Sequence, residues 1–592
     1  MSEYRFPYQD ALFVLNELVD LEQICHNAGL DEFAEGLGEA VLDEAAKLGG
    51  EQLAPLNRIG DQQGATISDN TVQQTEGFSE VYQQFCEGGW PSLAGNPEFG
   101  GQGLPVSLAV AVNEVWQSAN MGWSLCPLLT QGSIEAIETH GSEQLQQTYL
   151  PKLISGEWTG TMNLTEPDAG TDLAALKTRA VPEGDHYRIT GQKIFITWGD
   201  HQMTENIVHL VLARLPDAPA GVKGISLFVV PKFLLDENGN TTDQRNDAFP
   251  VALEHKLGIH GSPTCVMSFG DNEGAIGYLV GEENNGLACM FTMMNDARQG
   301  VGLQGLSISE RAYQQALEYA KERIQGTLRD GSRISIIKHP DVRRMLLQMK
   351  SATQAMRALT YVARAEVDHI HNTTDEAAKA KHKARTDLYT PIVKGWITEL
   401  AQEVTYLAVQ VHGGMGFIEE TGVAQHYRDA RILTIYEGTT GIQALDLIGR
   451  KTLSDSGAAL TDLLAEIETD LNGITAVELQ DIVSANRTAL NTANSAKQWV
   501  LETGSQDMSA AGSASVNYMM LLGYLCGGWL MAKSADIAYK QLGESDADAE
   551  YLNAKITCAR FFAEQLLPRT VSLLKAMQAG GETVMALSEE QF

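Results

Sequence analysis

Apolar residues recur at helical spacing from about residue 36 to about 157, in segments such as FAEGLGEAVLDEAAKL and SLAVAVNEVWQSANMGWSLCPLL. The Gly/Pro-rich stretch 96–105 interrupts this spacing. Glycine and proline end helices rather than extend them, so this stretch is expected to be a loop. The spacing therefore predicts a first unit made of helices, with one loop inside it.

Between about residues 158 and 280 the pattern changes to short alternating or β-branched runs, namely HYRITGQKIFIT, NIVHLVLARL, KGISLFVV and SPTCVMSFG. These runs predict the strands of an antiparallel barrel or sandwich. The polar stretch 236–247 between them predicts a turn or an excursion from the sheet.

Helical spacing returns after Gly286 and persists to about Arg450, in long amphipathic segments such as SERAYQQALEYAKERI. A Ser/Asp/Gly break at 454–457 is followed by further helices. We therefore expect five parts: an N-terminal extension (1–35), an N-terminal helical domain (36–157), a central β-barrel domain (158–282), a C-terminal helical bundle (283–452) and an appended helical domain (453–592).

The composition places the chain among folded globular proteins, because 44% of its residues are apolar and 20% are charged. With 592 residues, the chain is too long for one hydrophobic core, so several domains are expected. Lys and Arg number 42 against 76 Asp and Glu, which leaves a formal charge of −34. That charge repels nucleic acid and anionic lipid, so we expect no nucleic-acid partner.

The seven cysteines, at positions 25, 86, 126, 265, 289, 526 and 558, show no C-x-x-C spacing. Reduced, buried thiols therefore explain them better than a disulfide framework or a zinc cluster. We expect no metal site.

The segment MSEYRFPYQDALFVLNELVDL has acidic residues where a signal peptide carries a basic region followed by an apolar run. We therefore expect a cytoplasmic protein. The most apolar stretch, residues 518–532, is shorter than the roughly 20 residues that a helix needs to cross a bilayer. It predicts a buried helix rather than a transmembrane segment, with a peripheral membrane contact as the lesser alternative.

Residues Gly300–Gly305 satisfy the pattern G-x-G-x-x-G, which cradles a dinucleotide pyrophosphate when it lies between a strand and a helix. Here the preceding residues MFTMMNDARQ are predicted as helix, and no βαβ repeat follows. The glycines are therefore expected to permit close packing of helices, and a Rossmann domain is rejected.

Two segments at a defined spacing carry the chemistry: LTEPDAGTD at 164–172 and GQKIFIT at 191–197. Alone, the first is a turn rich in hydroxyls and backbone amides, which suits a phosphate or a flavin edge but also an ordinary loop. Together, and between helical flanks, the two segments resemble those of the acyl-CoA dehydrogenase family. The resemblance covers about residues 36–450.

The resemblance implies FAD as the cofactor. Thr165 and Thr171 take the positions that hold the flavin and part of its pyrophosphate. Phe195 and Thr197 match the aromatic and hydroxyl positions that face the flavin, where a hydrogen bond to N5 helps it to accept hydride. Asn163 departs from the family, which usually has a small residue at this position.

A second match comprises the segments QVHGGMGF and, beyond it, RDARILTIYEGTT. By itself the glycine run predicts the end of a helix and a turn. In the family, the residues matched by Gln410, Gly413 and Gly414 approach the FAD of another subunit. Gln425 occupies a position that is often basic in the family. His412 is expected to be buried or to cap a helix rather than to act as a base.

Glu437 is the predicted catalytic base. Removing a proton from the α-carbon of a thioester needs a base that is stronger than an ordinary carboxylate and yet unprotonated near neutral pH. The apolar neighbours at 432–436, together with a bound acyl chain, are expected to exclude water and raise its pKa. Gly438 gives the backbone freedom to aim the side chain. As an alternative, Glu437 is a first-turn acid that complements the dipole of the next helix.

In the family, the backbone N–H of this glutamate and a ribityl hydroxyl of FAD bind the thioester oxygen, which stabilises enolate charge. Loss of the α-proton and of a hydride from the β-carbon then yields a trans-2-enoyl-CoA. An electron-transfer flavoprotein takes up the electrons.

Further site residues follow from the same resemblance. Arg298 matches an arginine near the mouth of the active site, and Arg323 matches one that contacts the FAD pyrophosphate across the subunit interface. Arginines on amphipathic helices are otherwise simply solvated. Thr439 completes the expected cofactor-binding set.

The segment 256–264 resembles the substrate-side strand and turn of the family. Ser262 and Thr264 are therefore expected at the CoA arm, with an ordinary hairpin turn as the alternative. Tyr436 and Gly438 complete the expected substrate-binding set.

The fold implied is a multidomain α+β fold: an N-terminal helical domain, a central antiparallel β-barrel, a C-terminal four-helix bundle and an appended helical domain. The appended block resembles the long branch of the family, which includes 3-methylmercaptopropionyl-CoA dehydrogenases and bacterial fatty-acyl-CoA dehydrogenases. Because the added domain would cover the surface that shorter members use to form tetramers, we expect a homodimer.

We therefore expect FAD-dependent α,β-dehydrogenation of an acyl-CoA thioester, with 3-methylmercaptopropionyl-CoA, of dimethylsulfoniopropionate catabolism, as a candidate substrate. Short- to long-chain fatty acyl-CoA is the alternative, because spacing does not place the side chains that set the depth of the pocket. An acyl-CoA oxidase and a noncatalytic DNA-binding flavoprotein of the same fold are further alternatives. The charge of −34 opposes the last of them.

Overall fold

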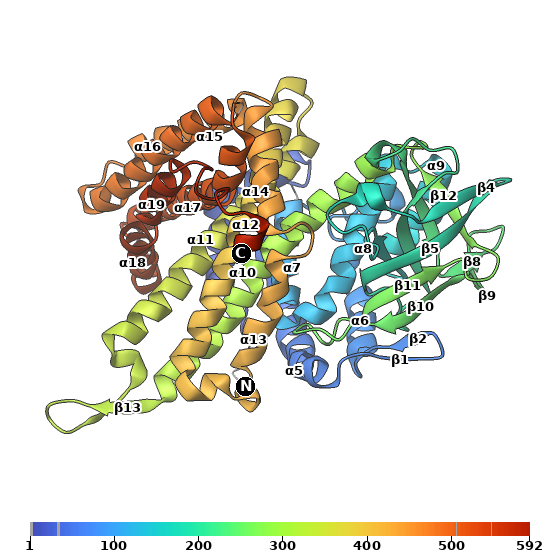
Figure 1. Cartoon of the computed structure of the whole chain (residues 1–592). Coiled ribbons are helices and arrows are strands. Elements are labelled where there is room, and N and C mark those ends of the chain that lie inside the picture. The colour runs from blue at the N-terminus through green and yellow to red at the C-terminus, as the bar shows by residue number, and fades with distance from the viewer. Residues whose placement is uncertain (1–3, 32–35, 505, 546) are drawn as a thin grey trace. The chain divides into compact units, whose positions relative to one another are not determined.

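The computed structural model describes residues 4–31, 36–504, 506–545 and 547–592 (Figure 1). The chain forms two compact units. The sheet unit comprises Lys47–Leu104 and Ala119–Gly300, and the bundle unit comprises Met1–Ala46, Pro105–Ser118 and Val301–Phe592. The five boundaries expected from the sequence stay predictions, because this division follows contacts rather than the order of the chain.

An eight-stranded sheet forms the centre of the sheet unit, in the order β10-β11-β5-β12-β7-β6-β3 with β4 beside β5 and β6. Strands β6 and β7 are almost continuously buried, so both of their faces are covered. The strands are β3 (Trp158–Asn163), β4 (Arg179–Glu183), β5 (His186–Thr197), β6 (Asn206–Arg214), β7 (Ile225–Pro231), β10 (Ala248–Leu253), β11 (Thr264–Phe269) and β12 (Ala275–Val280).

Strand β4 closes the sheet into a barrel. It pairs with β5 along its length and with β6 through Arg179 and Arg214, so that β5, β12, β7, β6 and β4 form a ring. The expected barrel is therefore present, with two departures from the antiparallel pattern. Strand β4 pairs with β6 in parallel at Arg179/Arg214, and strand β3 runs parallel to β6 from the pair Trp158/Asn206 onward. Alternation of side chains shows which residues face the core but not the direction of a strand, so the sequence could not reveal this pairing.

Helices, short helical turns and two hairpins complete the sheet unit. Its helices are α5 (Ala54–Gln63), α6 (Phe78–Glu87), α8 (Met121–His140), α9 (Glu143–Ile154) and the first part of α10 (Gly286–Glu322). The short turns are η2 (Gly49–Leu53), η3 (Trp90–Ser92), η4 (Pro97–Phe99), η5 (Leu173–Ala175) and η6 (Val222–Gly224). The hairpins are β1 (Thr66–Ser68) with β2 (Thr71–Gln73), and β8 (Phe233–Leu235) with β9 (Thr241–Arg245).

The polar stretch 236–247 is a turn in part only. The Asp236 carboxylate accepts the backbone N–H groups of Asn238 and Asn240 at 2.9 and 2.8 Å, which closes the turn. The residues that follow it form β9 and pair with β8. The polar composition therefore did not reveal a short hairpin whose residues are mostly half-buried.

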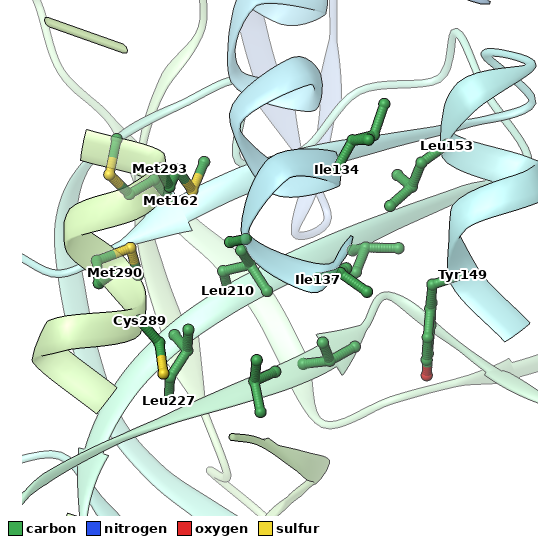
Figure 2. Close-up of a cluster of buried hydrophobic side chains, with 14 of the residues drawn as sticks. Ile134, Ile137, Tyr149, Leu153, Met162, Leu210, Leu227, Cys289, Met290 and Met293 are labelled. Carbon is green, nitrogen blue, oxygen red and sulfur yellow. The ribbon is translucent and has the colours of Figure 1, made fainter. Parts of the chain in front are cut away.

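The core of the sheet unit lies between its helices and the sheet (Figure 2). Complete burial of such side chains contributes about 1.5–3 kcal/mol each, so this cluster holds the strands firmly against the helices. Its labelled members are Ile134 and Ile137 of α8, Tyr149 and Leu153 of α9, Met162, Leu210 and Leu227 of the strands, and Cys289, Met290 and Met293 of α10.

The bundle unit consists of helices, short turns and one hairpin. Its helices are α1 (Tyr8–Phe13), α2 (Leu21–Asn27), α4 (Leu37–Leu48), α7 (Val106–Ala119), the rest of α10, α11 (Pro340–Asn372), α12 (Glu376–His412), α13 (Val423–Ala430), α14 (Thr440–Ile448), α15 (Ala458–Gly473), α16 (Gln480–Thr503), α17 (Met508–Gln541), α18 (Ala549–Gln565) and α19 (Arg569–Met577). The turns are η1 (Val14–Val19), η7 (Ile336–Lys338), η8 (Gly413–Phe417), η9 (Glu419–Thr421), η10 (Arg431–Thr434), η11 (Gly449–Leu453), η12 (Val477–Leu479) and η13 (Glu589–Gln591). The hairpin of β13 (Ile324–Thr327) and β14 (Arg333–Ser335) was not expected from the sequence.

The glycines at 302 and 305 have the packing role expected for them. A Cβ atom on Gly302 would lie 2.4 Å from Cγ1 of Val393, and one on Gly305 would lie 2.9 Å from Cγ2 of Ile397. Val393 and Ile397 belong to α12, which therefore approaches α10 closely only because these positions lack side chains. The rejection of a Rossmann motif agrees with this helical setting.

Helix α17 carries the apolar run 518–532, and it packs against both α11 and α12. The run is almost entirely buried, as expected for an interior helix. Within the part of the chain that the structure describes, none of the helices has the length and apolar character needed to cross a membrane.

The segment around α1 links α11 to α18. The Asp10 carboxylate accepts hydrogen bonds from Gln354 of α11 at 3.2 Å, from Tyr551 of α18 at 3.0 Å and from Lys555 of α18 at 3.2 Å. Phe13 packs edge-on against the ring of Tyr551, with 6.2 Å between the ring centres. The N-terminal extension is thus an integral part of the bundle unit.

Candidate active site

The loop Leu164–Asp172 of the sheet unit follows β3 and turns back onto β5. The carbonyl oxygen of Thr165 accepts the N–H of Ile194 at 2.9 Å. Glu166 and Ala169 exchange two backbone hydrogen bonds of 3.0 Å, which close the turn between them. The two segments predicted to hold a flavin therefore meet within one unit.

A buried ion pair fixes this loop. The Glu166 carboxylate accepts Nζ of Lys193 at 2.8 Å, the Thr178 hydroxyl at 2.5 Å and the backbone N–H groups of Lys177 and Thr178 at 2.6 and 3.0 Å. Lys193 also donates to the Leu164 carbonyl at 3.0 Å. Burial lowers the pKa of Lys193 to about 8, against the opposing pull of Glu166. Burial alone would raise the pKa of Glu166. The charge of Lys193 and the hydrogen bonds to the carboxylate outweigh burial and lower that pKa. Glu166 and Lys193 are therefore both charged at pH 7.

Strand β5 presents Phe195 in a left-handed backbone conformation. Phe195 has a φ of 60° and is 58% exposed, whereas Trp198, with a φ of 53°, is buried. Such a conformation costs a non-glycine residue about 1–3 kcal/mol and is concentrated at functional sites. The exposed ring, with the Thr197 hydroxyl two residues further on, offers a flat apolar surface and a hydrogen-bond donor. Both suit a flavin ring.

The far end of the loop offers open donors. Gly170 and Thr171 are exposed, and their backbone N–H groups have no hydrogen-bond partner among the described residues. A Cβ atom on Gly170 would meet nothing within 4 Å. Adjacent free amides with a hydroxyl on the second residue are donors that suit a phosphate. The loop and strand therefore fit a flavin nucleotide: an aromatic surface at one end and phosphate donors at the other.

The residues assigned to the CoA arm and the site mouth are buried. Ser262 is fully buried, and Thr264 at the start of β11 is 7% exposed. The Ser262 carbonyl accepts Nζ of Lys256 at 2.8 Å, which ties this turn together. Arg298 is also buried, and its Nη1 lies 3.4 Å from Oδ1 of Asn295. The substrate roles of Ser262, Thr264 and Arg298 stay predictions.

Glu437 lies in the bundle unit, on the turn between η10 and α14. It is half-buried with a φ of 56°, and Gly438 follows with a φ of 93°. Two successive left-handed residues reverse the chain here, which explains the glycine. Leu433 is buried but Ile435 is 46% exposed. The apolar residues that precede Glu437 in the sequence therefore shield its side chain from water only in part.

The same turn excludes the alternative role for Glu437. Helix α14 begins at Thr440, its N-cap is Thr439, and its first turn contains no acidic residue. The Thr439 hydroxyl accepts the N–H of Ile442 at 3.4 Å. Glu437 therefore precedes the helix and is not a first-turn acid that complements the helix dipole.

Buried side chains from two helices hold the backbone of this turn. Lys394 of α12 donates to the Gly438 carbonyl at 2.6 Å, and Gln443 of α14 donates to the Glu437 carbonyl at 3.1 Å. Lys394 and Gln443 are both fully buried. The strained conformation of Glu437 is therefore imposed by its surroundings, which fixes the direction of its side chain.

Tyr436 fixes the other side of the turn. Its hydroxyl donates a short hydrogen bond to Oε1 of Gln304 on α10. Burial, with the charge of Glu437 adding to it, raises the pKa of Tyr436, so the hydroxyl keeps its proton. The turn that carries Glu437 is thus bonded to three helices of the bundle unit.

His412 is buried, as expected. Its Nδ1 lies 2.7 Å from the Ala408 carbonyl, its ring stacks on Tyr319 with 4.3 Å between the ring centres, and burial lowers its pKa. Gln425, at the position that is often basic in the family, is also buried and donates to Asp429 at 3.2 Å. The stack of His412 on Tyr319 brings the end of α12 beside the end of α10.

A second group of predicted cofactor residues gathers where these two helices end. Arg323 lies one turn beyond Tyr319, while Gln410, Gly413 and Gly414 lie at the end of α12, and all four are exposed. A Cβ atom on either glycine would meet nothing within 4 Å. A guanidinium, an amide and open backbone together suit a phosphate.

The residues that hold the site in place were not expected from the sequence. Glu166 and Lys193 stand inside the two flavin motifs, and a lysine at an inward-facing position of a predicted strand is a signal that could have found them. Lys394 and Gln443 carry no such signal. Each looks like an ordinary polar residue of a helix until the fold brings it to the Glu437 turn.

Four protein-family models match the chain. The acyl-CoA dehydrogenase N-terminal domain matches residues 39–157, the middle domain residues 161–272 and the C-terminal domain residues 284–453. A model described as acetyl-CoA dehydrogenase C-terminal like matches residues 463–588. The appended helices therefore also have counterparts among known proteins.

Curated relatives agree over the length of the chain. The chain is 48% identical to 3-methylmercaptopropionyl-CoA dehydrogenase of Ruegeria pomeroyi, over 95% of this chain and 96% of the relative. It is 34% identical to a butyryl-CoA dehydrogenase of Syntrophomonas wolfei, over 100% of this chain and 99% of the relative. Subunit CarC of the caffeyl-CoA reductase-Etf complex of Acetobacterium woodii is 32% identical, over 55% of this chain and 74% of its own length.

A solved structure has the same architecture. Acyl-CoA dehydrogenase from Bacillus anthracis, complexed with FAD, superposes with a TM-score of 0.74 at 21% identity, over 92% of this chain and 88% of that chain. The fold with its appended helical domain is thereby confirmed. With the matches to three domains of one family and the identity to full-length dehydrogenases, the chain belongs to the acyl-CoA dehydrogenase family, whose cofactor is FAD.

Proposed function

We propose that this enzyme converts an acyl-CoA thioester to a trans-2-enoyl-CoA, with Glu437 as the base that removes the α-proton. The observation that carries the proposal is the Glu437–Gly438 turn. A carboxylate is held there in a left-handed conformation by Lys394 and Gln443. Strain maintained by buried hydrogen bonds at a glutamate is expected where a reacting group must be aimed.

The chain's own residues perform the proton chemistry. The Glu437 carboxylate takes the α-proton, and the electron pair of the broken C–H bond is shared with the thioester carbonyl, so negative charge develops on its oxygen. The pair then forms the double bond between the α- and β-carbons as hydride leaves the β-carbon. The backbone N–H of Glu437 is assigned as the donor to that oxygen. The half-buried position of Glu437 takes its carboxylate partly out of water while leaving it open to a bound substrate.

Bound FAD supplies the acceptor for the hydride that leaves the β-carbon. The residues predicted to hold it include the aromatic surface and the open donors described above. They are Thr165, Thr171, Phe195 and Thr197 of the sheet unit, and Arg323, Gln410, Gly413, Gly414 and Thr439 of the bundle unit.

We further propose 3-methylmercaptopropionyl-CoA as the preferred substrate. The support is the 48% identity to a dehydrogenase of that name, against 34% to a butyryl-CoA dehydrogenase. Arg298, Ser262, Thr264, Tyr436 and Gly438 are the residues assigned to the substrate. A fatty acyl-CoA substrate is the alternative.

A series of thioesters tests the substrate assignment. Pentanoyl-CoA is the matched control, because it differs from 3-methylmercaptopropionyl-CoA by a methylene in place of sulfur. We expect kcat/KM for the sulfur compound to equal or exceed that for pentanoyl-CoA and to exceed that for octanoyl-CoA by about tenfold, since surplus methylenes in a fitted pocket are rejected by such factors. Assays use a dye as the electron acceptor. Highest kcat/KM with octanoyl-CoA or a longer thioester would establish the fatty-acyl alternative instead.

An electron-transfer flavoprotein is the proposed electron acceptor, and the support is the relative that is a subunit of an Etf complex. The same assays separate the remaining alternatives. Turnover with the dye and no oxygen uptake in air is expected; oxygen uptake without the dye would identify an oxidase. The charge of −34 opposes the DNA-binding alternative.

A homodimer is also proposed. Exposed apolar side chains gather where α12 ends and α13 begins, and Phe417 is the most exposed of them at 88%. Such a patch on a folded surface marks an interaction site. The set comprises Tyr406, Met415, Phe417, Ile418 and Tyr427. A cytoplasmic location stays a prediction from the sequence.

The dimer proposal is tested by replacing Phe417 with Asp and measuring molar mass by light scattering. We expect the mass to fall from two chains to one at micromolar concentration, because a carboxylate buried in an apolar interface lacks a partner. Val477→Asp is the control, since Val477 is also an exposed apolar residue but lies on η12. A wild-type protein with the mass of one chain would refute the dimer, and an unchanged mass of Phe417→Asp would refute this surface.

A further inference from the structure

Glu166 joins three separate stretches of the sheet unit. Its carboxylate is bonded to Lys193 on β5 and to the backbone N–H groups of Lys177 and Thr178, while its own position lies in the loop after β3. The Thr178 hydroxyl adds a further hydrogen bond. Ionised carboxylates that accept several donors make the strongest hydrogen bonds of proteins, so this junction is firm.

Lys193 joins the same loop a second time. Its Nζ donates to the Leu164 carbonyl at 3.0 Å as well as to Glu166 at 2.8 Å. The Lys193 side chain is 0% exposed and that of Glu166 is 6% exposed. Neither group can turn to solvent in place of its partner, so each depends on the other.

The pair lies next to the residues that fit a flavin. Thr165 stands between Leu164 and Glu166, and Phe195 stands two positions beyond Lys193. We propose that Glu166 and Lys193 are positioning residues for FAD, which set the loop and the exposed ring of Phe195 at a fixed separation. The inference rests on the proposed function, because it concerns the same flavin site.

A second ion pair on this loop is a natural control. Asp168 and Lys177 approach to 2.5 Å, but their side chains are 67% and 74% exposed. Water can solvate either group if the other is removed, so such a pair adds little to the structure. Burial therefore distinguishes the two pairs, although both involve a carboxylate of the same loop.

The test measures how fast FAD leaves the purified holoenzyme, followed as the rise of free-flavin fluorescence after dilution. Glu166→Gln and Lys193→Met are each expected to speed the release at least tenfold, since each leaves the other group charged, buried and without its partner. Asp168→Asn is expected to stay within twofold of the wild type. Circular dichroism and the thermal midpoint with excess FAD show whether each variant is folded.

A purely structural role would change the thermal midpoint and the release rate together. The double variant Glu166→Gln/Lys193→Met separates the two effects and also serves if the single variants do not fold. It has no unpaired buried charge, so we expect a midpoint close to that of the wild type and still at least tenfold faster release of FAD.

The inference would be overturned by folded Glu166→Gln that releases FAD within twofold of the wild type, by a folded double variant that does so, or by Asp168→Asn that accelerates release as much as Glu166→Gln. Failure of the double variant to fold would also overturn it, because the pair would then serve the whole unit. A wild-type protein that binds no FAD would instead refute the proposed function.

Discussion

Glu437→Gln is expected to leave a folded, yellow flavoprotein whose kcat is lower by roughly 10²- to 10⁴-fold, the range of a lost general base. Glutamine has nearly the same shape, and its backbone can keep the carbonyl bond to Gln443 and the left-handed turn. Its amide cannot take the α-proton. Dye reduction measures kcat, and the flavin absorbance should not bleach on addition of the thioester.

Glu318→Gln is the matched control for this variant. Glu318 lies on α10 of the same unit, is exposed and, among the described residues, pairs with Lys321 alone in a surface contact of 3.1 Å. Loss of such a pair changes little, so we expect unchanged kcat. Normal bleaching of Glu437→Gln would refute the assignment of the base, whereas loss of the yellow colour would show that Glu437 serves the fold instead.

Arg357→Met is expected to destabilise the bundle unit by about 3–5 kcal/mol, the cost of breaking a buried ion pair on one side. Arg357 and Glu114 are both fully buried, 2.7 Å apart, and Arg357 also meets Glu310 at 2.8 Å. Burial raises the pKa of Glu114 even with Arg357 beside it. Removal of the guanidinium leaves the Glu114 carboxylate with the Tyr361 hydroxyl, at 2.6 Å, as its remaining hydrogen-bond partner among the described residues.

Thermal unfolding followed by circular dichroism measures this effect. We expect the midpoint of the bundle unit to fall by roughly 5 °C, given the entropy of unfolding of a unit of this size. Lys321→Met is the control, because the Lys321–Glu318 pair is about half exposed and is expected to contribute less than about 1 kcal/mol. A midpoint of Arg357→Met within 1 °C of the control would show that the ion pairs of Arg357 with Glu114 and Glu310 do not contribute about 3–5 kcal/mol to the stability of the unit.

Strands β5, β6, β7 and β11 could be predicted because their signal is local. The run His186–Thr197 in the sequence is strand β5 in the structure, with the same two end residues. The direction of β3 could not be predicted, because alternation of side chains is the same in parallel and antiparallel strands. The hairpin of β13 and β14 was missed as well, since all four residues of β13 are exposed and show no alternation.

The candidate site also contains residues that the sequence could predict and residues that it could not. Glu437 and Phe195 stand in short motifs, so their chemistry can be read from a few neighbouring residues. The buried lysine that holds the Glu437 turn cannot, because it is distant in the sequence: Lys394 lies 44 positions from Gly438. Pairings of that kind depend on the packing of whole helices, which one sequence does not encode in any local pattern.

The bonds of Asp10 have a consequence for biosynthesis. Lys555 follows Asp10 by 545 residues, so at about 5–20 residues per second a ribosome needs roughly half a minute to two minutes to make the partner. During that interval Asp10 and Phe13 lack their contacts with α18. The bundle unit therefore completes its assembly only near the end of translation. A chain that terminates before α18 lacks Tyr551 and Lys555, which bind the N-terminal segment.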